Sequence, residues 1–160
     1  MIMGLRNKGI VLTLVISLLF SGRIAAAEST PTVQISRVGS QPSSIGSSDN
    51  FVGRVQIDSP FRGSGPSRIF GATVTFAAGA CTAWHSHAFG QTLIVTSGAG
   101  RVQQWGGPVQ EIHPGDIVWI PPGVKHWHGA SEKIGMTHIA IVEDEGGKST
   151  VWMEKQKTCN

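Results

Sequence analysis

From residue 51 onward, short runs of β-branched and aromatic residues alternate with glycine and proline. The punctuation recurs about every ten residues, which is typical of an all-β sandwich or barrel. Every window with a 3.6-residue apolar period is broken by a glycine or proline, so we expect no helix of useful length. The predicted strands are 52–57, 67–76, 82–87, 92–97, 100–104, 108–112, 117–120, 125–129, 136–143 and 150–154.

The first 27 residues have the features of a secretory signal peptide. Arg6 and Lys8 precede the apolar run 10–20, and small residues at 25–27 form a cleavage site. The run is shorter than the roughly 18–20 apolar residues of a membrane anchor. We therefore expect cleavage after residue 27 and a periplasmic or secreted protein. Residues 28–50, rich in Ser, Gly, Pro and Gln, predict a tether or wrapping arm before a barrel at 51–155 and a tail at 156–160.

Cleavage removes the excess positive charge of the chain. Three of the 13 basic residues lie in the signal peptide, so 13 less 3 leaves 10, against 10 acidic residues. The mature chain has no basic cluster, and we expect neither nucleic acid nor a membrane as its partner. Its length suits one domain with one hydrophobic core.

The two cysteines, Cys81 and Cys159, leave three interpretations open. Export to an oxidising compartment permits a disulfide between them. Against it, Cys159 is the penultimate residue and lies outside any patterned segment, which predicts a mobile tail. Alternatively, Cys81 faces the barrel interior, because it shares strand parity with His85 and His87.

Four residues predict a metal site. His85 and His87 are one residue apart on an extended segment, so both side chains point to the same face. Gln91 keeps that parity across a bend at Gly90, and His126 follows a Pro-Gly turn on another strand. A single histidine is more often a hydrogen-bonded core residue. Three imidazoles and an amide oxygen that converge inside a small barrel suit a divalent metal.

The spacing of these residues resembles the two sequence motifs of the cupin superfamily. Residues 79–98 read G-x5-H-x-H-x3-Q-x6-G, and residues 115–130 read G-x5-P-x-G-x2-H-x3-A. The resemblance implies an all-β, single-domain cupin, a jelly-roll barrel of the double-stranded β-helix type. Two positions depart from the family pattern: Gln91 replaces the usual glutamate, and Ala130 replaces the usual terminal asparagine.

The neutral ligand Gln91 affects the expected chemistry. It leaves the dipositive charge of the metal uncompensated, which favours polarisation of a substrate oxygen over oxygen activation. Imidazole and carbonyl-oxygen ligands suit Mn(II) or Fe(II), and Co(II), Ni(II) or Zn(II) are also compatible. His128 shares the parity of His126, and His138 lies on the following strand. Each is either a general acid or base near the metal or a hydrogen-bonded interior residue.

Within the cupins, residues 51–153 resemble the bacterial manganese-dependent hydroxynitrile lyases, including the glutamine ligand. This resemblance implies Mn(II) on His85, His87, Gln91 and His126, catalysis by His138 with His128, and a small-molecule pocket that includes Ala72 and Val74. It also implies a homo-oligomer, either a dimer or a tetramer. Two alternatives stay open: a metal-dependent cupin dioxygenase, and a non-catalytic cupin of the cell envelope that binds a metal or a small ligand.

Overall fold

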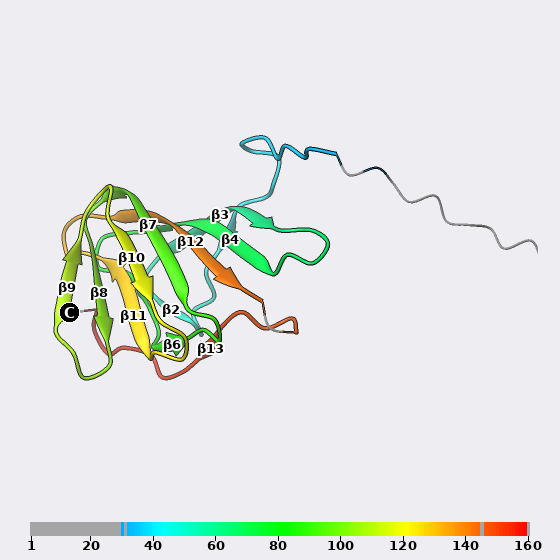
Figure 1. The fold of residues 1–160 in the computed structure, drawn as a ribbon. Helices are drawn as coiled ribbons and strands as arrows, with labels where there is room; N and C mark the ends of the chain where they lie inside the picture. The colour runs from blue at the N-terminus through cyan, green and yellow to red at the C-terminus, as the bar shows by residue number, and fades with distance from the viewer. Residues whose placement is uncertain (1–29, 31, 145, 160) are drawn as a thin grey trace, which may run out of the picture. The chain divides into compact units, whose positions relative to one another are not determined.

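The computed structural model describes residues 30, 32–144 and 146–159 (Figure 1). The chain divides into a unit of residues 1–34 and a unit of residues 35–160. The predicted signal peptide and its cleavage site lie outside the described residues. Within the described ranges, no helical segment has both the length and the apolar character that a membrane span requires.

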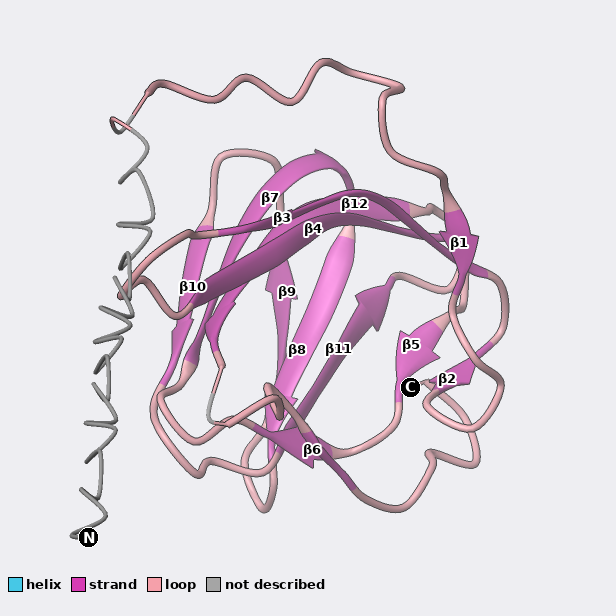
Figure 2. Ribbon diagram, turned by 90° about the vertical axis from the view of Figure 1, so that its right-hand side faces the viewer, coloured by secondary structure: helices cyan, strands magenta, loops and turns pink. Residues whose placement is uncertain are grey.

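Two antiparallel sheets build the second unit, which confirms the predicted all-β class. Figure 2 shows the first sheet arching over strands of the second. The first sheet has, in spatial order, β1 (Ser44–Ile45), β3 (Val55–Arg62), β4 (Ile69–Phe76), β12 (Met136–Glu143), β7 (Gln91–Gly98) and β10 (Ile117–Ile120). The second has β13 (Val151–Trp152), β6 (His85–Ser86), β11 (His126–Ala130), β5 (Cys81–Thr82) and β2 (Phe51–Val52), with β8 (Gly100–Gln104) paired to β11 and β9 (Val109–Ile112) paired to β8.

The interior follows the two-residue period of the strands. In β4, Ala72, Val74 and Phe76 are buried, whereas the threonines between them are only half-buried. The neighbouring strand β12 buries Met136 and His138 on the same side, and the Cα atom of His138 lies opposite that of Val74. A register shift between Thr137 and His138 disturbs the pairing of β12 with β7. Such an irregularity changes the direction in which nearby side chains point, and here it lies next to the buried His138.

Two predicted strands are each divided into shorter ones. The predicted strand 52–57 is interrupted at Gly53, whose φ is +78°. A Cβ atom there would lie 2.8 Å from the Cβ atom of Ala80, so both the backbone conformation and the close approach require glycine. The predicted strand 82–87 is divided into β5 and β6 by a bend at Trp84.

The expected arm at residues 28–50 is not wholly separate from the barrel. Ser44 and Ile45 form β1, which pairs with Ile57 and Gln56 of β3. The pattern of apolar residues did not predict this strand, because only one of its two residues is apolar. The remaining described residues of the arm are largely exposed.

Of the three interpretations of the cysteines, the structure agrees with the disulfide and disagrees with the other two. Cys81 and Cys159 form a disulfide with a Cα–Cα distance of 5.7 Å, and Cys159 is only 5% exposed. The prediction of a mobile C-terminus is therefore wrong at Cys159. The predicted interior position of Cys81 is also wrong, because Thr82 lines the cavity while Cys81 packs with Trp127. The bend between β5 and β6 breaks the parity on which that prediction depended.

Candidate metal centre and cavity

Three histidines share one hydrogen-bonding pattern. Nδ1 of His85 lies 2.9 Å from the carbonyl oxygen of Ala83, and Nδ1 of His126 lies 2.8 Å from that of Val124. Nδ1 of His87 lies 2.6 Å from the carbonyl oxygen of Ser149. Because a carbonyl oxygen only accepts, each Nδ1 carries the proton. The lone pair of each neutral ring is therefore on Nε2, the form that binds a metal.

The sheet brings these three rings together. His85 of β6 lies directly opposite His126 of β11, and their ring centroids are 4.1 Å apart. His87 follows β6, and its ring centroid lies 5.1 Å from that of His85 and 5.6 Å from that of His126. All three side chains are buried. The sequence prediction that these histidines converge agrees with this geometry.

Gln91, the first residue of β7, faces the same three rings. The bend before it requires Gly90, where φ is +83° and a Cβ atom would lie 2.6 Å from the carbonyl oxygen of Ile120. Oε1 of Gln91 lies 3.0 Å from Nε2 of His126.

At the contact between Gln91 and His126, the acceptor Oε1 of Gln91 faces the lone pair on Nε2 of His126. Burial lowers the pKa of His126 to about 4, so this ring carries no second proton at neutral pH. Burial also lowers the pKa of His85 and His87. A cation shared by the two groups would satisfy both acceptors, and Nε2 of His87 is buried without a partner in the described part of the chain. The donor set therefore fits a divalent metal.

A second set of three histidines shares two members, His85 and His126, with the first set. Ring nitrogens of His85, His126 and His128 lie within 4.8 Å of one another, which also suits a metal. His128 differs from the other histidines in its partner, because its Nδ1 lies 3.2 Å from Nε2 of His138 and not near a carbonyl oxygen. Its tautomer is therefore not fixed by the backbone, and we favour His87 over His128 as the third imidazole ligand.

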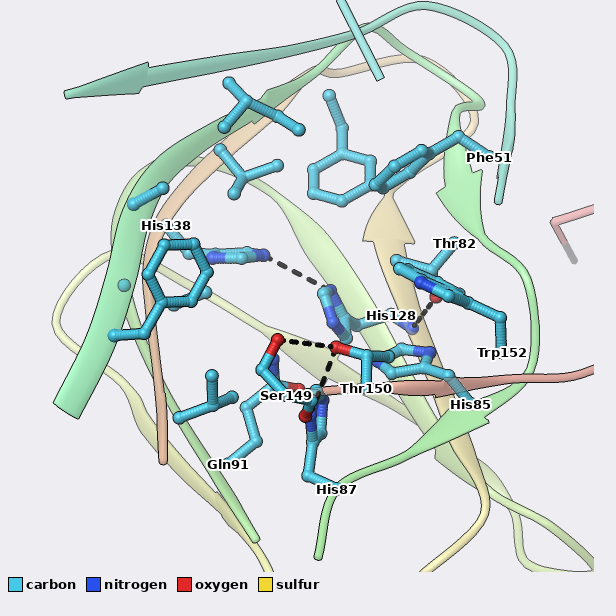
Figure 3. Close-up of a pocket in the computed structure, with 18 residues that line it drawn as sticks. Phe51, Thr82, His85, His87, Gln91, His128, His138, Ser149, Thr150 and Trp152 are labelled. Carbon is cyan, nitrogen blue, oxygen red and sulfur yellow. Dashed lines mark hydrogen bonds between the residues drawn. The ribbon is translucent and has the colours of Figure 1, made fainter. Parts of the chain in front are cut away.

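A cavity of about 160 Å³ opens beside these groups (Figure 3). That volume is comparable to the roughly 150 Å³ that holds a benzene ring in a dry protein cavity. Its polar side includes His85, His87, Gln91, His128 and His138. Its apolar side includes Phe51, Ile57, Phe70, Ala72, Val74, Phe76, Ala140 and Val142. The predicted pocket residues Ala72 and Val74 thus both line it.

His128 and His138 form a buried pair within this cavity. Their ring centroids are 4.9 Å apart, and the ring of Phe76 packs against both. Burial lowers the pKa of His138 to about 4 and that of His128 well below its ordinary value, so both rings are neutral at neutral pH. One proton bridges the pair. This proton can belong to either ring. In both cases, one of the two outer nitrogens, Nε2 of His128 or Nδ1 of His138, carries a proton and the other a lone pair, which suits proton transfer.

Sequence reasoning missed part of the cavity wall. Ser149, Thr150 and Trp152 line it from the C-terminal segment, and Ser149 orients His87 through its backbone carbonyl group. No side-chain pattern marks a carbonyl acceptor, so this contact left no signal in the sequence. The remaining histidine of the described chain, His113, lies at the surface, and its side chain is 58% exposed.

Comparisons with known proteins agree with the fold and the motifs. Residues 72–141 match the family model described as "Cupin domain". The chain is 56% identical over 122 residues, 76% of this chain and 93% of the relative, to the (R)-mandelonitrile lyase of Granulicella tundricola. It resembles a cupin-like protein of Thermotoga maritima with a TM-score of 0.66 and 38% identity, over 77% of this chain and 90% of that one. A cupin-2 domain of Rhodospirillum rubrum, TM-score 0.61, is 16% identical over 78% of this chain and 82% of that one, and supports the fold alone.

Proposed function

The chain belongs to the cupin family, and on this premise we propose that it is a metal-dependent lyase that cleaves cyanohydrins such as mandelonitrile into an aldehyde and cyanide. The observation that carries the proposal is a wholly neutral donor set, of which His85, His87 and Gln91 line the same cavity as a neutral, buried histidine pair. The substrate class comes from the (R)-mandelonitrile lyase described above.

We infer that His85, His87, Gln91 and His126 hold the metal. When bound, a divalent cation with four neutral ligands keeps its full charge and supplies Lewis-acid polarisation of a substrate oxygen. The three carbonyl acceptors leave the lone pair of each ring on Nε2, where it is available to the metal. Imidazole and amide ligands suit Mn(II), which we propose as the resident ion, while Fe(II), Co(II), Ni(II) and Zn(II) also accept such a donor set.

The remaining cavity residues bind the substrate and move its proton. The phenylalanines and aliphatic residues of the apolar side pack against the organic substituent, and they exclude water from it. Cleavage transfers the hydroxyl proton of the cyanohydrin to the departing cyanide. The pair of His128 and His138 accepts a proton at one outer nitrogen and donates one from the other, and we assign the donation to His138.

One assay on the purified mature protein tests this function. Mandelonitrile cleavage is followed by cyanide release before and after chelation, together with metal analysis. We expect one divalent ion per chain, loss of cleavage on chelation, and equal rates with and without oxygen. Cleavage that survives chelation contradicts the mechanism. A strict need for oxygen indicates a cupin dioxygenase instead, and a metal-loaded protein without turnover indicates a binding protein of the envelope.

We further propose that the protein is exported. The signal-peptide pattern of residues 1–27 supports this localisation, and so does the disulfide, since disulfides persist in oxidising compartments. N-terminal sequencing of the protein from a periplasmic extract should begin at Glu28. Cleavage of the signal peptide removes three of the 13 basic residues and leaves 10 basic and 10 acidic residues. From this balance of charge we infer a small-molecule partner, and neither nucleic acid nor a membrane.

We also propose a dimer or a tetramer in solution. On the outer face of β10, Ile117 and Trp119 are 70% and 59% exposed, and large exposed apolar side chains are common at oligomer interfaces. Light scattering on the mature protein gives the mass. A monomer, or an oligomer unaffected by Ile117→Lys with Trp119→Lys, contradicts the use of this face.

A further inference from the structure

The C-terminal segment 149–159, here called the strap, closes one side of the cavity although it lies beyond residues 72–141 that match the family model. Its Ser149, Thr150 and Trp152 line the cavity (Figure 3). The ring centroid of Trp152 lies 4.9 Å from that of His85 and 5.5 Å from that of Phe51. The strap therefore covers one metal-ligand candidate and part of the apolar wall.

The strap also supplies the acceptor that orients His87. The carbonyl groups that bind His85 and His126 come from residues two positions earlier in the chain, so they move with the ring they hold. The acceptor for His87 is Ser149, 62 residues later in the sequence. Displacement of the strap would free His87 and leave the other two rings in place.

Backbone pairing holds the strap over a short stretch, and Nζ of Lys155 donates one hydrogen bond from the strap to the carbonyl oxygen of Ser48, at 2.9 Å. Strand β13 pairs with β6 over two residues, next to two backbone bonds: N–H of Met153 to O of Trp84 at 2.9 Å, and N–H of Trp84 to O of Glu154 at 3.0 Å. Lys125 forms an ion pair with Glu154 at the surface. A two-residue ladder and an exposed ion pair are individually weak.

The remaining anchor is covalent. The Cys81–Cys159 disulfide ties the end of the strap to β5, and both cysteines pack with Trp84 and Trp127 in a small apolar cluster. Cys81 is buried completely, and Cys159, itself 5% exposed, follows the exposed residues Lys157 and Thr158. Cleavage of the disulfide would thus leave only non-covalent contacts to hold the strap in place.

We propose that this disulfide locks the strap over the metal centre, so that the affinity of the site for its metal depends on the redox state of Cys81 and Cys159. The inference rests on the metal centre of the proposed function. A dithiol supplies the two electrons: its thiolate attacks one protein sulfur and expels the other as a thiolate. Its second thiol then closes on the mixed disulfide, so that two protein thiols and one cyclic disulfide remain.

Metal release from the mature chain tests the lock. Mn(II)-loaded protein is mixed with excess chelator in three forms: oxidised wild type, wild type reduced with dithiothreitol and desalted without oxygen, and Cys159→Ala. Loss of an outer-shell partner weakens metal binding by about 10- to 100-fold, so we expect release faster by that factor in the last two forms. Thr158→Ala, an exposed neighbour on the strap, is the matched control and should behave as the oxidised protein.

Amide hydrogen exchange on metal-free protein separates strap release from general loosening. We expect reduction or Cys159→Ala to remove protection at Met153 and Trp84 while the amides of β4 and β12 keep theirs. Equal metal release from the oxidised protein and Cys159→Ala overturns the proposal, and so does a uniform loss of protection across the barrel. Because neither readout uses cyanohydrin, a failure of the proposed lyase activity is recognised separately.

Discussion

Two neighbouring groups of buried histidines differ chiefly in what their Nδ1 atoms contact. Those of His85, His87 and His126 each donate to a backbone carbonyl group, which fixes the tautomer. The Nδ1 of His128 faces the ring of His138, so a proton can sit on either nitrogen of that contact. The same side chain thus has the tautomer that suits a metal in one place and the contact that suits proton transfer in the other, which is the basis of the two proposed roles.

Burial alone does not produce this difference. Desolvation lowers the pKa of all five histidines, and all five are neutral at neutral pH. What separates the groups is the hydrogen-bond partner, a backbone acceptor that cannot donate or a second imidazole that can. Hydrogen-bond partners are therefore more informative about the roles of these histidines than exposure or pKa.

The largest effect should follow loss of a ligand with a fixed tautomer. In His126→Ala the site loses one imidazole, and we expect loss of bound metal and a fall in cleavage rate of about 1000-fold or more, since Lewis-acid stabilisation amounts to several kcal/mol. Metal analysis and cyanide release measure the two effects. A His126→Ala protein with full metal content and rate would show that this histidine is not a ligand.

Removal of the proton carrier should leave the metal in place. In His138→Gln we expect a normal metal content and a rate lower by about 10²- to 10⁴-fold, the usual contribution of general acid–base catalysis. The exposed His113→Gln is the control and should change neither quantity. Parallel loss of metal and rate in His138→Gln would remove the distinction between the two groups.

The metal-free protein should lose stability in acid. The pKa of His138 is about 4 in the folded chain, below its ordinary value of 6.5, so the unfolded chain binds a proton first as the pH falls. Stability is therefore full above pH 6.5 and falls between pH 6.5 and 4, by up to about 1.4 kcal/mol per pH unit for each such histidine. Urea unfolding at several pH values measures the slope, which His138→Gln should reduce and His113→Gln should not. An unchanged slope in His138→Gln would contradict the burial argument.

The smallest effect should follow a change in the charge of the fourth ligand. Gln91→Glu adds an anionic oxygen to the donor set, so we expect tighter metal retention and cleavage slower by about tenfold, or about 1.4 kcal/mol in the barrier. Chelator competition and cyanide release give the two numbers. A faster Gln91→Glu enzyme would show that the neutral ligand does not serve polarisation.

Much of this arrangement could be predicted from the sequence. Periodicity placed β8, β10 and β12 closely, and the motif spacing brought His85, His87, Gln91 and His126 together. Side-chain parity placed His128 on the cavity, and the family resemblance placed Ala72 and Val74 there. These features depend on local geometry, which the order of residues along a strand determines.

The remaining features depend on contacts between distant parts of the chain. The acceptor of His87 is a backbone carbonyl group, and any residue at position 149 would supply one. The interior position expected for Cys81 failed because the chain bends at Trp84, and parity does not continue through a bend. The disulfide depends on where the last residues return, which no pattern near Cys159 records.

The metal content of His128→Gln tests the central claim most directly, because nitrogens of His128 also lie within reach of His85 and His126. If His128 carries protons and His87 is the ligand, the purified variant should hold one divalent ion per chain, as the wild type does, and should cleave mandelonitrile slowly. Loss of the ion from His128→Gln, to the extent seen in His126→Ala, would contradict the assignment of separate roles to the two groups.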